Sequence, residues 1–519
     1  MKTICILALA LTAACNTSQK TVTDSPAIVN VAADPVVYAL TITEEELKEH
    51  LYTYASDDFE GRETGKPGQK KAAEYLKTIY NEMEVQAANE NGEYFQQVPL
   101  EMAKLPVGSI TVGDQLYEVG EDFISFSAGD GLFSELVYVG FGIDDTGYSD
   151  YENIDVSNKI ILIKSGEPKN EDGTYKLSGT GKKSVWSNSS ESFEKRLLAA
   201  KHNGAKAILY FDQNNYGRFK GYFNFMKTNE SGRMSLKKND DSPPLLLLNA
   251  QTAKAIYPDI KETDSASVLE ISVSLSLESS NVDVPSENVV AYIPGFEKPE
   301  EYVVISSHLD HIGISANGKI NNGADDDGSG TVAMLEIAEA FKKAAVTGNG
   351  PKRSIVFLHV TGEEKGLLGS QYYTDVAPLF PLEQTVANLN IDMIGRIDPK
   401  REGSRNYIYL IGSDKLSSDL HQLSERINDR YTQLELDYTY NDENDPNRFY
   451  YRSDHYNFAK NHIPIIFYFN GTHDDYHRPG DTPDKINYDL LTKRSRLIFH
   501  TAWEIANREE RVIVDKVSK

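Results

Sequence analysis

Between residues 287 and 469, continuous apolar runs alternate with amphipathic segments. The runs YVVISS, SIVFLHV, VANLNIDM and IPIIFYF begin at residues 302, 354, 386 and 463. Such runs are typical of strands that are covered on both faces. Between the first two lies GTVAMLEIAEAFKKA, where Leu335, Ala338 and Phe341 recur at helical spacing. The alternation predicts an α/β fold in which helices sandwich a mixed, mostly parallel sheet.

Two other sequence patterns precede this region. ITEEELKEHLYTYAS (42–56) and KKAAEYLKTIYNEM (70–83) have helical spacing, whereas residues 111–283 contain short β-rich runs separated by Gly and Asp turns. Residues 40–105 have no companion sheet of their own. We therefore predict one domain built from 39–110 and 284–519, with a β-rich domain, 111–283, inserted into it.

The N-terminus reads as an export signal. Lys2 precedes the apolar run ICILALALTAA, which is too short to span a bilayer, and Cys15 follows two small residues. This pattern resembles a bacterial lipobox and predicts a signal peptide at 1–15, a lipid on Cys15 and a flexible tether at 16–38. The chain would be exported and anchored to a bacterial membrane on its periplasmic or cell-surface face. Ordinary secretion with nearby cleavage is the alternative.

Charge and cysteine content exclude several classes of protein. The formal net charge is −25, so nucleic acid is not expected as a partner. The two cysteines, Cys5 and Cys15, both belong to the export signal. The mature fold therefore has no disulfide and no thiolate zinc site.

Histidines and carboxylates follow the predicted strands at their carboxyl ends, where ligands gather in open α/β sheets. Imidazole and carboxylate without thiolate suit a catalytic zinc ion or a harder ion such as manganese. The side chains are too numerous for one tetrahedral ion, but they suffice for two ions that share a bridging carboxylate. The candidates are His308 and Asp310, Asp325, Glu363 and Glu364, Asp392, and His473 and His477.

The motifs SSHLDH, NNGADDDGSG, TGEEKGLLGS, LNIDMIG and DYHRPGDT occur in that order. Together they resemble the two-zinc metallopeptidase family of aminopeptidase Y and glutamate carboxypeptidase, over about residues 40–110 and 285–510. The inserted segment, with VGFGI, YENIDVSNKIILIKSGEP and AAKHNGAKAILYF, resembles a protease-associated domain. The resemblance implies a zinc-exopeptidase-like fold, two divalent metal ions, with zinc as the expected metal, and peptide substrates.

Site roles also follow from this resemblance. It implies that Asp325 bridges the two ions, and that Glu363 is the general base. Asp310 would accept a hydrogen bond from His308 and fix its tautomer. The resemblance also implies His308 and Asp392 on one ion, Glu364 and His477 on the other, and Tyr476 as a substrate contact that stabilises the developing oxyanion. Arg452 and Asp454 belong to a polar patch in YRSDHYNF, which either lines the substrate cleft or forms a structural network.

Several alternatives stay open. GADDDGSG resembles a calcium loop with Glu336 at its twelfth position, although the helical pattern that begins at Gly330 disfavours this interpretation. His473 competes with His477 for one ligand position, and His311 is interpreted as structural or surface-exposed. An aminopeptidase is the predicted function. A carboxypeptidase, a dipeptidase and a glutaminyl cyclase would use the same site, and a transferrin-receptor-like protein would bind without catalysis.

Overall fold

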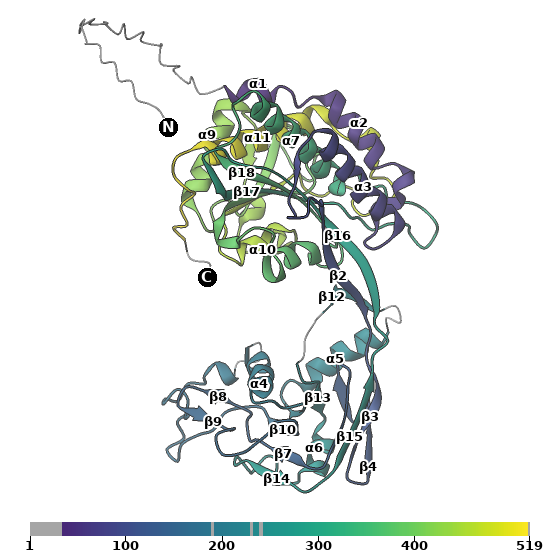
Figure 1. Cartoon of the computed structure of the whole chain (residues 1–519), viewed down its shortest axis with the longest axis vertical. Coiled ribbons are helices and arrows are strands. Elements are labelled where there is room, and N and C mark those ends of the chain that lie inside the picture. Colours follow the sequence, from purple (N-terminus) through teal and green to yellow (C-terminus); the bar gives the residue numbers. More distant parts are fainter. Residues whose placement is uncertain (1–33, 188–190, 229–231, 238–241, 517–519) are drawn as a thin grey trace, which may run out of the picture. The chain divides into compact units, whose positions relative to one another are not determined.

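The apolar runs of the C-terminal half form the centre of one large sheet (Figure 1). The computed structural model describes residues 34–187, 191–228, 232–237 and 242–516. The strand order in this sheet is β12-β2-β16-β18-β17-β19-β22-β20-β21, and β1 also pairs with β16. The strands are β1 Gln86–Ala87, β2 Phe95–Ala103, β12 Arg233–Leu236, β16 Val282–Ile293, β17 Lys298–His308, β18 Arg353–Val360, β19 Thr385–Ile391, β20 Tyr407–Ile411, β21 Glu435–Asp437 and β22 Ile465–Phe469.

The sheet is mixed, and its parallel part lies at the centre. Strands β18, β17, β19 and β22 pair in parallel, whereas β12, β2, β16 and β18 pair antiparallel. The predicted fold class is confirmed, with an antiparallel extension through β2 and β16. Because Ser306 pairs with both Leu358 and Asn390, the parallel strands end at one edge of the sheet. The site described below is assembled at that edge.

Helices cover both faces of this sheet (Figure 1). Helices α7 and α11 contact β17 and β18 on one face, and α10 contacts β19 and β22 on the other. The helices of this part of the chain are α1 Pro35–Ala39, α2 Glu44–Tyr54, α3 Pro67–Glu82, α7 Gly330–Val346, α8 Leu368–Gln371, α9 Ser418–Tyr431, α10 His455–Ala459 and α11 Tyr488–Asn507.

The segment predicted as an insertion forms two smaller sheets and a short hairpin. A six-stranded sheet has the order β14-β7-β10-β11-β13-β5, and a four-stranded sheet has the order β4-β3-β15-β6. Along β10, Ile160 and Leu162 enter one apolar core while Ile161 and Ile163 enter another. The elements are β3 Val107–Val112, β4 Gln115–Glu118, β5 Phe123–Ser125, β6 Gly129–Phe133, β7 Leu136–Tyr138, β8 Asp144–Asp145, β9 Tyr148–Ser149, β10 Ile160–Lys164, β11 Ala207–Phe211, β13 Leu245–Leu248, β14 Ser267–Leu269, β15 Val273–Glu278, α4 Glu191–His202, α5 Tyr216–Lys227 and α6 Ala250–Ile256.

The predicted domain boundaries at 110 and 283 stay a prediction. One strand of the segment, β12, pairs with β2 in the large sheet rather than within the two smaller sheets. The predicted tether is too long at its C-terminal end, because α1 already begins at Pro35. Tyr38 is buried there, stacked on Trp503 with ring centroids 5.6 Å apart.

The signal peptide and the lipid-bearing Cys15 lie outside the described residues and stay predictions. Within the described ranges, no helix combines the length and the apolar character needed to cross a bilayer.

Two buried histidines are expected to make the fold sensitive to acid. Burial lowers the pKa of both His359 and His455 to about 3, against about 6.5 in an unfolded chain. His359 contacts the Tyr80 and Ser307 hydroxyls, and His455 Nε2 lies 2.8 Å from the Tyr450 carbonyl oxygen. Because the unfolded state binds more protons between these pKa values, stability is complete above pH 6.5 and falls as the pH drops through this window.

At pH 5 each histidine is expected to lower the free energy of unfolding by about 2 kcal/mol relative to pH 7.5. Urea unfolding at a series of pH values measures this loss. His359→Gln should flatten the pH dependence, and His462→Gln, at an exposed position, should leave it unchanged. An equal slope in wild type and His359→Gln would contradict the assignment.

Candidate metal centre

The candidate side chains are carried by the ends of successive strands. His308 is the last residue of β17, and Asp392 directly follows β19. Glu363 and Glu364 follow β18 after a short turn. His477 lies in the loop after β22, and the three aspartates 325–327 lie in the segment Ala324–Ser329 that precedes α7.

Asp326 occupies the centre of this group. Its Oδ1 lies 3.2 Å from His308 Nε2, and its Oδ2 lies 3.1 Å from His477 Nε2. The carboxylate therefore faces one imidazole with each oxygen. This is the position that a bridging ligand between two cations requires.

The remaining partners divide between the two sides of Asp326. Asp392 Oδ1 lies 3.6 Å from His308 Nε2, and Glu364 Oε2 lies 3.2 Å from His477 Nε2. The pairing of His308 with Asp392, and of His477 with Glu364, agrees with the grouping that the sequence resemblance implied.

Asp325 is not part of this cluster, and the structure corrects that prediction. Its Oδ1 accepts hydrogen bonds from the Gly395 N–H (2.6 Å) and the Ser329 hydroxyl (3.0 Å). Its Oδ2 lies 3.2 Å from His473 Nε2. Successive side chains in a turn point in different directions, so the structure directs Asp326, rather than Asp325, towards His308 and His477.

The hydrogen bond of His308 also differs from the prediction. Its Nδ1 lies 2.9 Å from the backbone oxygen of Asp310, not from the carboxylate. A carbonyl oxygen can only accept, so Nδ1 donates and Nε2 of the neutral ring presents a lone pair. That lone pair faces the Asp326 and Asp392 carboxylates. Either a proton or a metal ion is needed between them.

The Asp310 carboxylate instead positions the general-base candidate. It accepts hydrogen bonds from the Thr64 hydroxyl (2.7 Å) and from the backbone N–H of Glu363 (3.1 Å). Burial raises the pKa of Glu363 well above its usual range, although His308 opposes this, and the Asp392 and Glu364 carboxylates raise it further. A carboxyl held among other carboxylates in this way suits proton transfer.

His311 also belongs to the cluster, and the sequence reasoning missed it. Its Nδ1 lies 2.9 Å from Glu364 Oε1 and 3.8 Å from Asp326 Oδ2. Gly323 makes room for the ring: its φ is +57°, and a Cβ there would lie 2.6 Å from an imidazole carbon of His311. The signal was its place in HLDH, three residues after His308.

The electrostatics show that these carboxylates require positive charge. Burial lowers the pKa of His477, but hydrogen bonds with Asp326 and Glu364 outweigh it and raise the value to about 10. Burial and Asp326 raise the pKa of Glu364, yet hydrogen bonds with His311 and His477 bring it down to about 2. Divalent cations bound between these carboxylates and neutral imidazoles would supply the positive charge. A donor set of imidazole and carboxylate fits zinc.

Asp327 also lies within ligand distance of His308 and Asp392. However, its oxygens are committed to backbone groups. Oδ2 accepts from the His308 N–H, and Oδ1 accepts from the Gly330 and Met393 N–H groups, at 3.0–3.2 Å. The Asp326 oxygens instead face the imidazoles of His308 and His477, which makes Asp326 the better ligand candidate.

A pocket opens onto the cluster. Tyr476 and Arg452 line it, whereas the fully buried Asp454 does not, and the substrate contacts of all three stay a prediction. Asp454 accepts a hydrogen bond from the Ser370 hydroxyl, and burial raises its pKa to about 7. The lining residues are Asp326, Glu363, Asp392, Met393, Phe449, Arg452, Ser453, Phe467, Phe469, Thr472, Tyr476 and His477.

The backbone that carries Asp326 is held from two sides. The buried Arg62 guanidinium donates to the carbonyl oxygens of Asn322 (2.7 Å) and Gly323 (2.8 Å). Asp481 Oδ2 accepts from the N–H groups of Asp325 (2.9 Å) and Asp326 (3.1 Å). Asp481 follows His477 in the same loop, so this loop both contributes an imidazole and positions Asp326.

Asp481→Ala is expected to weaken metal binding by about 10- to 100-fold, because loss of an outer-shell partner lets the ligand move. Asp481→Asn, which keeps an acceptor oxygen, should recover most of the affinity. Competition with a chromogenic chelator measures both variants. Asp474→Ala, at an exposed position in the same loop, serves as the control, and equal affinity in Asp481→Ala and wild type would refute the role.

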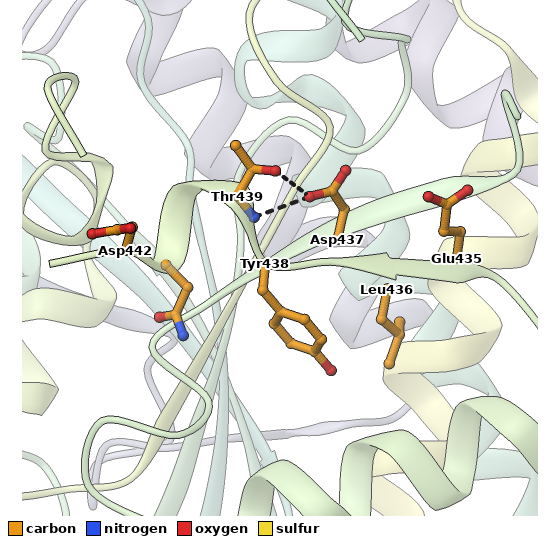
Figure 2. Close-up of a pocket in the computed structure, with 7 residues that line it drawn as sticks. Glu435, Leu436, Asp437, Tyr438, Thr439 and Asp442 are labelled. Atoms are coloured by element: carbon orange, nitrogen blue, oxygen red, sulfur yellow. Dashed lines mark hydrogen bonds between the residues drawn. The ribbon is translucent and has the colours of Figure 1, made fainter. Parts of the chain in front are cut away.

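A separate hollow beside β21 shows no comparable chemistry. Glu435 and Asp437 point to one side of the strand, and Leu436 and Tyr438 point to the other (Figure 2). Asp437 Oδ1 accepts from the backbone N–H (3.0 Å) and hydroxyl (2.7 Å) of Thr439, and its Oδ2 accepts from Arg401 Nε (3.0 Å). Its carboxylate is therefore committed to local structure.

Comparison with known proteins agrees with the candidate metal centre that the geometry defines. Residues 288–502 match the model of peptidase family M28, which confirms the predicted resemblance to a metallopeptidase family. The matched region contains all the residues of the cluster around Asp326.

The curated relatives include aminopeptidases. A probable leucine aminopeptidase 2 of Aspergillus oryzae is 26% identical over 385 residues, which cover 69% of this chain and 64% of that protein. Leucine aminopeptidase 1 of Sclerotinia sclerotiorum is 30% identical over 42% of this chain and 56% of its own length. The chain thus spans less than two thirds of these relatives. Among solved structures, an aminopeptidase from Aneurinibacillus sp. strain AM-1 aligns over 93% of this chain and 98% of its own, with 18% identity and a TM-score of 0.45.

Proposed function

We propose that this chain is a metal-dependent aminopeptidase that removes N-terminal residues from peptides. The observation that carries the proposal is the position of Asp326 between His308 and His477, with Glu363 lining the same pocket. The match to peptidase family M28 and the aminopeptidase relatives support peptide hydrolysis.

Two divalent ions, most simply zinc, are part of this proposal. His308 and Asp392 would hold one ion, His477 and Glu364 the other, and Asp326 would contact both. The pairing of the side chains on either side of Asp326 supports this division. The ions would supply Lewis-acid chemistry at the scissile peptide bond.

The chain's own residues account for the proton transfers. Glu363 takes a proton from the attacking water as the new C–O bond forms, and returns it to the leaving amine as the C–N bond breaks. The Asp310 carboxylate accepts a hydrogen bond from the backbone N–H of Glu363 and so fixes the backbone position from which the Glu363 side chain extends.

The pocket walls favour an apolar N-terminal side chain. Met393, Phe449, Phe467 and Phe469 line the pocket and belong to one apolar cluster. Burial of an apolar substrate side chain against them is favourable by about 25 cal/mol per Å² of surface removed from water.

The test is hydrolysis by purified protein. Aminoacyl anilides and peptides with free N-termini should be cleaved, leucine and phenylalanine substrates faster than aspartate substrates. A chelator should abolish turnover, and zinc or manganese should restore it. Cleavage of peptides only when their C-terminus is free, with no hydrolysis of aminoacyl anilides, would indicate a carboxypeptidase. Cyclisation of N-terminal glutamine would indicate a cyclase, and no turnover at full metal content would indicate a binding protein.

Tyr476→Phe is expected to lower kcat about 10²-fold, because the phenol lines the pocket and can donate to the developing oxyanion. The ring stacks on His477 with centroids 3.9 Å apart, and phenylalanine preserves that contact. Metal content should therefore be unchanged. Steady-state kinetics measure the effect against Tyr451→Phe, an exposed tyrosine, and an unchanged kcat would remove Tyr476 from the mechanism.

Export and lipid attachment at Cys15 complete the proposal. The supporting observation is the sequence alone, with two alanines directly before Cys15. Mass spectrometry of the mature N-terminus tests it.

A further inference from the structure

Helices α2 and α7 carry a second group of carboxylates, separate from the cluster around Asp326. The group consists of Glu46 on α2 and Glu336 and Glu339 on α7, and one oxygen of each lies within 4.8 Å of the others. Two oxygens that bind one calcium ion at about 2.4 Å lie at most about 4.8 Å apart. The three oxygens therefore meet the distance limit for ligands of a single calcium ion.

Two of these carboxylates each use one oxygen for a local contact. Glu46 Oε2 accepts a hydrogen bond from the hydroxyl of Thr43 (2.7 Å), the residue that caps the N-terminus of α2. Glu339 Oε2 pairs with Lys343 Nζ at 2.5 Å. Each of the two keeps a second oxygen, and both side chains are only half-buried, which leaves room for water ligands.

The third carboxylate, Glu336, is the most demanding. It is 2% exposed, and its Oε2 has no hydrogen-bond partner among the described residues. Its Oε1 lies 3.4 Å from His50 Nε2. Burial raises the pKa of Glu336, His50 opposes this, and the charges of Glu46 and Glu339 raise it further. Buried acceptor oxygens are almost always paired, so the unpaired Oε2 of Glu336 requires a partner in addition to His50.

We propose that Glu46, Glu336 and Glu339 bind a hard divalent cation, calcium or magnesium, which ties α2 to α7. The three ligands are carboxylates, the donors that these cations prefer. Lys343 neutralises one of the three charges, so a divalent ion would balance the others. Glu336, which fails as the last residue of a calcium loop beginning at Asp325, thus acquires a different set of partners.

The test uses the full chain, saturated with zinc so that the cluster around Asp326 is not titrated. Calcium and magnesium are then added separately, with sodium chloride at matched ionic strength as the screening control. Isothermal titration calorimetry measures stoichiometry and affinity, and a thermal melt measures the unfolding midpoint. We expect one further equivalent of calcium or magnesium to bind and to raise the midpoint, since the ion binds only the folded chain.

Glu336→Gln and Glu46→Gln are expected to weaken this binding at least about tenfold, because each removes one ligand charge. Without added cation, Glu46→Gln should raise the midpoint, since it relieves like-charge repulsion and its amide oxygen can still accept from the Thr43 hydroxyl. Glu49→Gln, at an exposed position on α2, should bind like wild type. Absence of binding, or equal binding by wild type and both variants, would overturn the proposal. Peptidase activity does not enter these measurements.

Discussion

Replacing Glu363 with glutamine is expected to lower kcat by about 10²- to 10⁴-fold while bound metal stays unchanged. The amide cannot accept the proton of the attacking water, but it preserves the shape of the side chain. The Glu363 N–H keeps its hydrogen bond to Asp310. Atomic absorption together with steady-state kinetics gives both quantities.

Glu364→Gln provides the contrast. Its carboxylate faces His477 and His311, so its loss should mainly reduce metal content rather than the proton transfer itself. Two adjacent glutamates would then give opposite patterns. Normal turnover by Glu363→Gln, or metal loss from it equal to that from Glu364→Gln, would overturn the division of roles.

Asp326→Asn is expected to remove most bound metal and to lower kcat/KM by at least about 10³-fold. Asp326 would contact both proposed ions, so neutralising it should weaken the binding of each. Loss of a group that only supports a ligand already costs about 10- to 100-fold in metal affinity. Equilibrium dialysis followed by elemental analysis measures the metal.

Asp325→Asn is the matched comparison for this prediction. An asparagine oxygen can still accept from the Gly395 N–H and the Ser329 hydroxyl, so we expect less than about a tenfold effect. The opposite order, with Asp325→Asn the more damaging, would restore Asp325 as the bridging candidate.

The centre of the fold was predictable because its strands are buried on both faces. YVVISS and SIVFLHV became β17 and β18, and the helical spacing from Gly330 became α7. The antiparallel extension was harder to predict. The pairing of β12 with β2 joins residues about 130 positions apart in the sequence, and neither strand is a continuous apolar run.

The position of the site was predictable from strand ends, whereas the choice within ADDD was not. Three consecutive aspartates have the same composition, and their directions depend on the turn that carries them. Only the partners distinguish them: His473 and Gly395 for Asp325, and His308 and His477 for Asp326. His311 escaped notice because its proximity to Glu364 depends on Gly323, which makes room for the ring.

The third aspartate of the triplet has a consequence for how this segment can vary in length. Asp327 joins the backbones of His308, Gly330 and Met393, which belong to the end of one strand, the start of α7 and the residues after another strand. Inserting or deleting one residue between 324 and 328 would move every carboxylate to its neighbour's position. Such an insertion or deletion should therefore lower stability and activity more than any single replacement here. It would displace the backbone contacts of Asp327 and the proposed metal ligand Asp326 together.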